Sequence, residues 1–271
     1  MKKYFQNKNF VAGFILFSLV LVLMLVGFIH LPYDPNAIDI TNKFAPCSFK
    51  HLLGTDHLGR DLLSRIMVGS RVSIFIGVIV MLFSFVIGTV IGSLCGYFQG
   101  KIDSIVMKLN DSFMAFPGLL LALMLIAVFS PSLKTTIVAL TFMAIPRFVR
   151  ISRSGFMKLK PSLFVMNAKS KGASNLRIML CHILPNAISD LIVTSSLTFS
   201  LAVLNESGLS YLGLGVQKPD ASFGNILSDA QRYILQSPQG VIIPAVILTV
   251  LVLGVNLLGD GYSEVNEHKR K

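Results

Sequence analysis

The sequence is poor in charge and has no tryptophan. Only 14% of its 271 residues are charged and 53% are hydrophobic, whereas about a quarter of the residues in a typical soluble domain are charged. The mean hydropathy is +0.71, and twenty phenylalanines supply much of the apolar bulk. This composition excludes an ordinary soluble domain and indicates a protein of the lipid bilayer.

Enzyme and metal-site motifs are missing as well. The chain has no G-x-S-x-G, H-E-x-x-H or C-x-x-C pattern. Its nearest approach to a phosphate loop fails, because Cys95 replaces the first glycine and Ile102 replaces Ser or Thr. The three cysteines are widely spaced, and the five histidines share no ligand spacing. We therefore expect neither an enzyme nor a bound cofactor, metal ion or disulfide framework.

What the sequence does contain is a series of long apolar runs. A helix needs about 20 residues to cross a bilayer, and six segments approach or exceed that length, with charges only near an end. They are Phe10–Ile29, Val72–Gly100, Ser112–Leu133, Thr135–Ile151, Asn186–Asn205 and Tyr233–Gly259. The sequence thus predicts an all-α, polytopic membrane protein with six transmembrane helices.

The distribution of positive charge orients these spans. If the N-terminus is inside, 16 of the 24 Lys and Arg fall in inner segments, as the positive-inside rule requires of cytoplasmic segments. We expect both termini in the cytoplasm, a tail at 1–9, a first span at 10–30, an extracytoplasmic segment at 31–71 and a core of five spans at 72–271. Membrane topology thus explains the net charge of +11 without nucleic acid. The first span is expected to be retained, because no small-x-small cleavage pattern follows it.

Ionisable side chains deep in a span would indicate ion-coupled transport, and the predicted spans contain none. Arg147, Arg150, Arg153 and Asp190 lie near predicted cytoplasmic ends, where long side chains reach the interface. A transporter driven by an ion gradient is therefore disfavoured, and the energy for transport would have to come from another source.

Glycines form a stripe on the second predicted span. Gly88, Gly92 and Gly96 are four residues apart and share a helix face, where small residues let two helix backbones approach closely in lipid. The alternative is a stripe that lines a pathway. We favour tight packing.

The inner segment 147–190 combines positive charge with apolar residues. It holds eight Lys and Arg and no acid before Asp190. A break at 171–175 separates two short amphipathic pieces, and Pro185 is expected to end the second. Two short helices joined at Gly172 would form a docking site for another protein. The alternative is a loop that rests on anionic lipid headgroups.

Three motifs stand out by their residues and spacing. The first is LGTDHLGRD at 53–61, whose glycines and charges indicate an ordered segment outside the bilayer; it comprises Gly54, Thr55, Asp56, Gly59, Arg60 and Asp61. The second joins Gly172-Ala173 to Leu184-Pro185. The third is LSYLGLG at 209–215, in a stretch from 206 that appears too rich in glycine for a helix interior.

Together these motifs resemble the permease subunits of the dipeptide/oligopeptide/nickel class of ABC importers, of the second-permease type. The resemblance implies the ABC type I importer permease fold and an ATPase-coupling loop at about 158–186. By spacing, the family's conserved Glu falls on Met166 and its Ile on His182, so one polar contact to the ATPase is not kept. The residues assigned to the coupling loop are Met166, Asn167, Ala168, Gly172, Ala173, Leu184 and Pro185.

The resemblance also implies function and partners. It places the chain in the bacterial inner membrane as half of a translocation pathway, with a second homologous permease subunit, two cytoplasmic ABC ATPase subunits that hydrolyse the ATP, and an extracytoplasmic solute-binding protein. Residues 31–39 and 229–234 look closer to nickel-type permeases. The expected substrate is therefore a metal (nickel, cobalt or zinc) or a metal chelate, and the alternative is a di- or oligopeptide. Remote alternatives are an ion-coupled secondary transporter and a non-transporting membrane scaffold.

Overall fold

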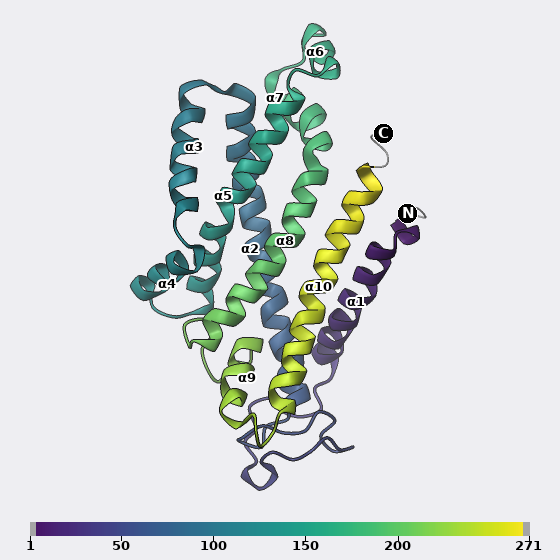
Figure 1. Ribbon diagram of the computed structural model, residues 1–271, viewed down its shortest axis with the longest axis vertical. Coiled ribbons are helices and arrows are strands. Elements are labelled where there is room, and N and C mark those ends of the chain that lie inside the picture. The colour runs from purple at the N-terminus through teal and green to yellow at the C-terminus, as the bar shows by residue number, and fades with distance from the viewer. Residues whose placement is uncertain (1–3, 268–271) are drawn as a thin grey trace.

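The computed structural model describes residues 4–267, which form an elongated bundle of helices (Figure 1). The long helices are α1 (Lys8–Ile29), α2 (Leu62–Phe98), α3 (Gly100–Ala115), α4 (Gly118–Phe129), α5 (Leu133–Leu159), α8 (Leu184–Tyr211) and α10 (Gln239–Glu267). The short ones are α6 (Leu163–Ser170), α7 (Asn175–Arg177) and α9 (Phe223–Ala230), with a π-helix at Ile178–Ile183 and 3₁₀ turns at Tyr4–Gln6, Ile40–Asn42 and Gln231–Tyr233. Within these residues the one extended pairing is an isolated bridge between Thr55 and Asp61, so the all-α prediction is confirmed.

Five helices in the described chain are long and apolar enough to span a membrane, and a bent pair makes a sixth candidate. The pair is α3 and α4, whose axes meet at 88°, so the apolar run over 112–133 is broken between two helices and does not form one continuous helix. Phe116 is extended (φ −82°, ψ 138°), because the ring of Pro117 excludes the residue before it from the helical region. Residues 101–111, which separate the predicted second and third spans, are part of α3.

Several spans are longer than their apolar runs. α2 begins ten residues before the predicted span, where the Asp61 side chain accepts a hydrogen bond from the Ser64 N–H. α8 continues to Tyr211, which corrects the prediction for 206–211, whereas residues 212–215 lie outside the helix as predicted. Gly208 is the only glycine in the added turn, and the burial of Glu206, Leu209 and Ser210 outweighs its weak helix propensity.

The glycine stripe of α2 faces α5. A Cβ atom added at Gly96 would lie 2.5 Å from the Arg153 carbonyl oxygen, and one at Gly88 would lie 2.9 Å from that of Ile145; Gly92 is similarly close to Val149. Such separations exclude any side chain at these positions. The prediction of tight helix packing is therefore confirmed.

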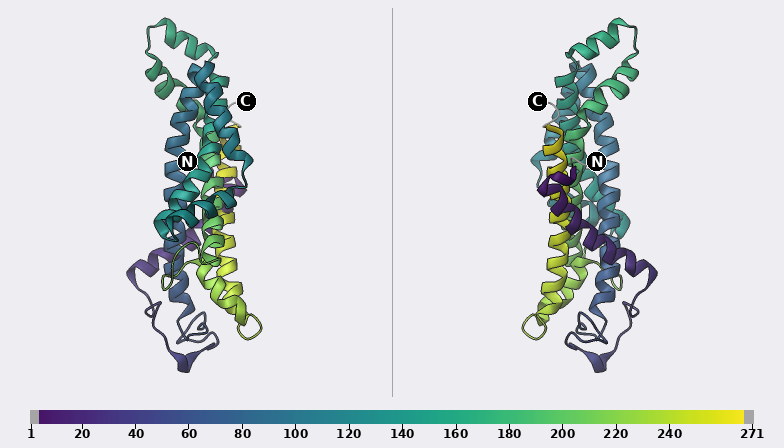
Figure 2. Two further views of the ribbon diagram at one scale, coloured as in Figure 1. Left: turned by 90° about the vertical axis from the view of Figure 1, so that its left-hand side faces the viewer. Right: turned by 90° about the vertical axis from the view of Figure 1, so that its right-hand side faces the viewer.

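Helices α1 and α10 pack side by side in the same manner (Figures 1 and 2). A Cβ at Gly13 would lie 2.6 Å from the Leu258 nitrogen, and one at Gly254 would lie 2.7 Å from that of Phe17. Both described ends of the chain lie toward the end of the bundle that carries α6, and residues 31–61 cover the opposite end (Figure 1). We call residues 31–61 the cap.

Candidate functional site

Residues 160–183, here called the α6–α7 segment, project beyond the other helices (Figure 2). Helix α6 ends in a Schellman motif, in which the Ala173 N–H donates to the Ala168 carbonyl (3.1 Å) and the Gly172 N–H to that of Lys169 (3.0 Å). Gly172 has φ +78°, a left-handed conformation that favours glycine. The predicted break between two short helices is confirmed, and Gly172 makes the turn.

The residues assigned to the coupling loop divide between two faces of this segment. Ala168 lies in an apolar cluster that joins α6 and the π-helix to Phe156 of α5 and Tyr97 of α2. The Tyr97 hydroxyl also donates to the Asn175 side chain (2.8 Å). Ala173 and Leu184 are half-buried, and the others are exposed: Met166, Asn167, Gly172 and Pro185. The segment is thus fixed to two long helices on one side and free on the other.

Pro185 does not end a helix as predicted. The π-helix runs directly into α8, and Pro185 occupies the first turn of α8. Proline is tolerated there because the N–H groups of a first turn have no partner within the α-helix. Residues 175–211 therefore form one continuous helix that joins α7 to α8.

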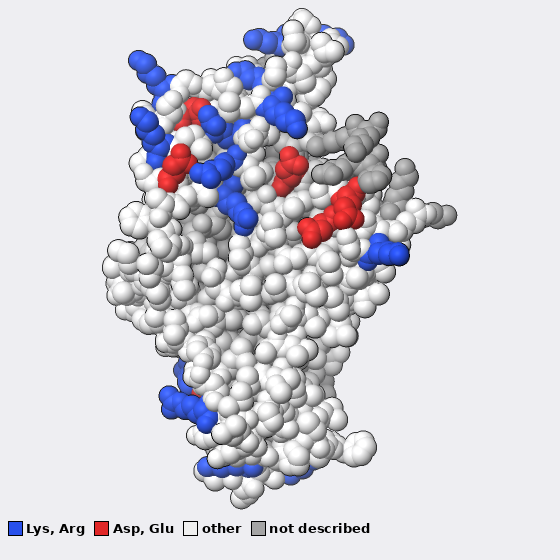
Figure 3. All heavy atoms as spheres, viewed as in Figure 1, with Lys and Arg blue, Asp and Glu red and all other residues white. Residues whose placement is uncertain are grey.

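The exposed part of the α6–α7 segment carries both apolar and positively charged side chains. Leu163, Met166, Leu176 and Leu180 are exposed. Residues 158–186 contain no Asp or Glu, and the cations in this range are Lys158, Lys160, Lys169, Lys171 and Arg177. Figure 3 shows positive side chains over α6 and a charge-free band across the middle of the visible face. This surface suits a protein cleft with apolar walls and an acidic rim.

The six residues singled out in the motif at 53–61 form the last part of the cap, directly before α2. Gly54 and Gly59 have φ near +79° and +76°, and a Cβ at Gly54 would lie 2.6 Å from the Ala45 carbonyl oxygen. The Thr55 hydroxyl accepts from the Ala45 N–H (2.8 Å) and donates to the Asn42 carbonyl. Asp61 caps α2 and also bonds His51 Nδ1 (2.9 Å). These residues therefore shape an ordered cap.

Asp56 and Arg60 extend the motif to a distant helix. Arg60 Nε donates to Asp56 (2.6 Å), and Arg60 Nη2 donates to Asp229 of α9 (3.0 Å). Arg65 lies within 4 Å of both carboxylates, and Lys218 pairs with Asp229. Burial alone would raise the pKa of Asp229, but Lys218 and Arg60 hold it below its usual value. The sequence analysis did not link Arg65, Lys218 or Asp229 to Arg60, because 169 residues separate Arg60 from Asp229 and no local pattern reports such a contact.

We predict that Asp229→Asn loosens the cap from α9. Removing one member of a buried ion pair costs about 3–5 kcal/mol, and Arg60 is 7% exposed. Because the pKa of Asp229 is lower in the folded protein than the unfolded value of 3.8, this contribution is complete above pH 3.8 and is lost as the pH falls through the lowered pKa. Limited proteolysis of the purified protein at neutral pH should cleave the cap of the variant faster. Asp220→Asn, which changes an exposed carboxylate, is the control and should cleave at the wild-type rate.

A second buried group was also missed. The sequence analysis placed Glu206 in an outer loop and found no ionisable group within a span, but the structure places it inside α8, with no exposed surface. Its carboxyl accepts hydrogen bonds from Ser73 of α2 (2.8 Å) and Ser210 (2.7 Å). The signal available was a lone acid between apolar residues at 199–209, which the nearby glycines obscured.

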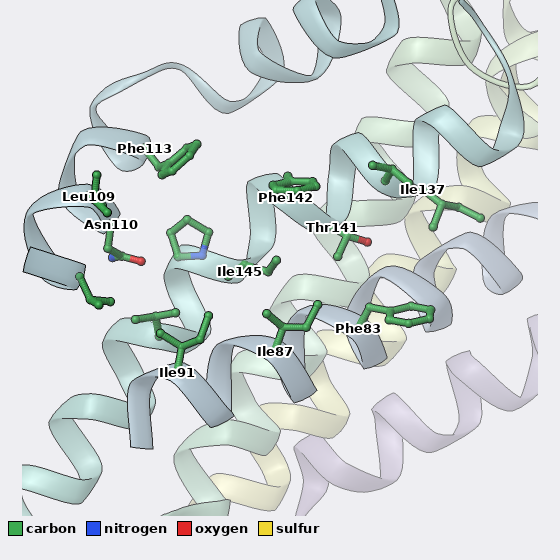
Figure 4. Close-up of a pocket in the computed structure, with 14 residues that line it drawn as sticks. Phe83, Ile87, Ile91, Leu109, Asn110, Phe113, Ile137, Thr141, Phe142 and Ile145 are labelled. Atoms are coloured by element: carbon green, nitrogen blue, oxygen red, sulfur yellow. The ribbon is translucent and has the colours of Figure 1, made fainter. Parts of the chain in front are cut away.

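An apolar groove of about 480 Å³ lies between α2, α3 and α5 (Figure 4). Phe83 and Ile87 of α2, Leu109 of α3 and Phe142 of α5 are among its walls. Its polar members are Asn110 and Thr141, and no charged side chain lines it. The groove suits an apolar helix or an acyl chain rather than a hydrated solute.

Comparison with known proteins identifies the family. Residues 88–271 match the model of the binding-protein-dependent transport system inner membrane component. The chain is 35% identical to a putative peptide transport system permease protein of Brucella abortus, over all of this chain and 91% of the relative. It is 35% identical to a dipeptide transport system permease protein of Haemophilus influenzae (98% and 92%) and 34% identical to a glutathione transport system permease protein of Pectobacterium atrosepticum (98% and 88%).

The fold has a counterpart among solved structures. A chain of the inward-facing MetNI methionine ABC transporter superposes with a TM-score of 0.60 at 22% identity, over 73% of this chain and 94% of that one. This likeness supports the predicted permease fold. The chain therefore belongs to the family of binding-protein-dependent inner membrane transport components and is a multi-pass permease subunit of an ABC importer.

Proposed function

We propose that the chain is one of two permease subunits of an ATP-driven importer of di- and oligopeptides. The names of its relatives refer to peptide, dipeptide and glutathione transport, and they cover nearly the whole chain. They favour the peptide alternative over the metal or metal-chelate substrate that the sequence analysis preferred. The nearness to nickel-type permeases stays a prediction that these relatives do not support.

The α6–α7 segment is the proposed site of coupling to two cytoplasmic ATPase subunits. Its exposed residues include apolar and positively charged side chains, and its buried face is fixed to α2, α5 and α8. Closure of an ATPase cleft around it would therefore move long helices rather than a flexible loop. The alternative of a loop lying on lipid headgroups fits less well, because the segment projects along the bundle axis (Figure 2).

The proposed orientation places the α6 end in the cytoplasm. Both described chain ends lie toward the α6 end (Figure 1), and most Lys and Arg belong to the segments on that side. In this orientation the tail (1–9) is cytoplasmic, and the first span (10–30) and the core (72–271) are placed as the sequence analysis expects. The extracytoplasmic segment, expected at 31–71, is reduced to the cap at 31–61 because α2 begins at Leu62. A solute-binding protein would then dock on the cap side.

Substrate and energy source are tested together. The chain, its sister permease, the ATPase subunits and the binding protein are reconstituted into liposomes, and uptake of a labelled dipeptide is measured with and without ATP. We expect uptake only with ATP and binding protein. Uptake by this chain alone under an ion gradient would instead indicate a secondary transporter. If the complex took up no peptide and a deletion strain lost nickel, cobalt or zinc selectively, the hypothesis of a metal or metal-chelate substrate would be favoured instead.

A further inference from the structure

The Glu206 carboxyl is the centre of a buried polar cluster where α8 approaches the cap. Besides Ser73 and Ser210, it lies 3.4 Å from the Ser207 hydroxyl, and Ser222, the N-cap of α9, also bonds to it. Its donors thus come from α2, from α8 and from the start of α9. One side chain joins three parts of the fold that are far apart in the sequence.

Cationic side chains near this cluster are engaged elsewhere. Arg65 bonds the Pro35 carbonyl (3.2 Å) and faces Asp56 and Asp229. Arg71 bonds the Gly27 carbonyl and lies 4.2 Å from the centre of the Phe28 ring. Among residues 4–267, no ion pair includes Glu206. The cluster is therefore held by hydroxyl hydrogen bonds and not by a salt bridge.

The hydrogen bonds continue from Glu206 into residues 212–222, here called the outer segment. The Ser210 hydroxyl, which donates to Glu206, accepts from the Val216 N–H (2.9 Å). The Val216 carbonyl accepts from the Asn225 side chain (2.9 Å), which also donates to the carbonyl of Asp220 (3.1 Å). The conformation of the outer segment thus depends on a chain of bonds that begins at Glu206.

Backbone contacts make this arrangement close-fitting. A Cβ at Gly224 of α9 would lie 2.7 Å from Ser210 Cβ, and one at Gly215 would lie 2.7 Å from the Ser210 nitrogen. On the other side, a Cβ at Gly69 of α2 would lie 3.3 Å from the Ser222 carbonyl carbon. The outer segment and α9 therefore fit between α8 and α2 only while Ser210 keeps its place.

We propose that Glu206 is a positioning residue of the transport cycle, which holds the outer segment closed against α2 and α8 through Ser73 and Ser210. The proposal rests on the importer function proposed above. Release of these bonds frees the outer segment and α9, which the cap also contacts through Asp229. A buried acceptor that loses its donors is destabilised, so the Glu206 carboxyl favours the closed arrangement in which Ser73 and Ser210 donate to it.

The first test measures the outer segment without reference to transport. Val216, which is 2% exposed, is changed to Cys in a Cys47→Ser, Cys181→Ser background, which removes the two exposed cysteines. The purified protein is labelled with a hydrophilic maleimide. We expect Glu206→Ala to accelerate labelling by about tenfold or more through local opening, and Glu206→Gln, which retains an acceptor and gains a donor, to label at the parent rate.

The matched control is Ser84→Ala. Ser84 is a fully buried serine of α2 whose hydroxyl bonds only carbonyls of its own helix. Its removal should leave the labelling rate unchanged. Equal labelling rates in Glu206→Ala and its parent would overturn the proposal, and so would equal acceleration by Ser84→Ala, since that would indicate general loosening of the bundle.

The second test uses the reconstituted importer. Glu206→Ala should lower kcat for uptake at an unchanged KM and raise the number of ATP molecules hydrolysed per substrate imported, and Glu206→Gln should restore both. Unchanged kcat and ATP stoichiometry in Glu206→Ala would contradict a role in the cycle, even if the variant were less heat-stable. Failure of the wild-type complex to import peptide would contradict the importer function instead, and the labelling result would still decide whether Glu206 holds the outer segment.

Discussion

Replacing Gly172 by Val should reduce ATP-driven uptake about tenfold or more while leaving the amount of protein in the membrane nearly unchanged. At φ +78° an L-residue costs about 1–2 kcal/mol and a β-branched one more, so the Schellman turn would open and α6 would lose its position. Gly172 itself is exposed and an added Cβ meets nothing within 4 Å, so the packing of the long helices should be unaffected. Uptake and membrane content are measured in the same cells.

Gly100 offers a matched control for this variant. It has φ +85° and also has nothing within 4 Å of an added Cβ, but it is the first residue of α3, outside the α6–α7 segment. Gly100→Val carries the same backbone penalty and should retain most of the uptake. Wild-type uptake by Gly172→Val, or equal losses in both variants, would remove the coupling role from Gly172.

Gly92→Leu should prevent the bundle from folding. The backbones of α2 and α5 are in contact along the glycine stripe, so a leucine side chain has no room unless the helices separate. Overpacking of a core costs about 1–3 kcal/mol when side chains can shift, and here the neighbouring atoms are backbone, which raises the cost. We expect little or no protein in the membrane fraction, as measured by immunoblot.

The control is Gly208→Leu on α8. Gly208 is also a glycine within a long helix, but it is exposed and an added Cβ meets nothing within 4 Å. This variant should accumulate to the wild-type level. Normal accumulation of Gly92→Leu would show that α2 and α5 can separate without loss of the fold, and would contradict the packing described here.

The apolar runs were sufficient to predict helices but not their ends. Hydropathy reports which residues tolerate lipid, whereas a helix ends where its backbone is capped. α2 therefore begins at Leu62, directly after its N-cap Asp61, and includes charged residues that precede the apolar run. In the same way, α8 continues past its apolar run to Tyr211. The bend at Pro117 could have been predicted from the sequence, because proline restricts the backbone of the residue directly before it. Its direction and size depend on what α3 and α4 pack against.

In the candidate site, too, the sequence predicted features that depend on nearby residues and missed those that depend on distant ones. The turn at Gly172 and the turns at Gly54 and Gly59 follow from nearby residues, so the sequence located them. The link from Arg60 to Asp229 and the bonds of Glu206 to Ser73 join positions more than a hundred residues apart. Only the packing of α8 and α9 against α2 brings these residues together, so no spacing rule could have found them.

The glycine contact between α2 and α5 has a mechanical consequence. Two helices whose backbones touch cannot slide or bend independently, so the pair behaves as one stiff lever. α5 has 27 residues, which at about 1.5 Å per residue gives an arm of about 40 Å. The middle of α5 lines the groove, and its last residue, Leu159, precedes the α6–α7 segment. If α5 tilts by about 10° about one end, its other end moves by about 7 Å. This displacement is comparable to the width of a peptide backbone.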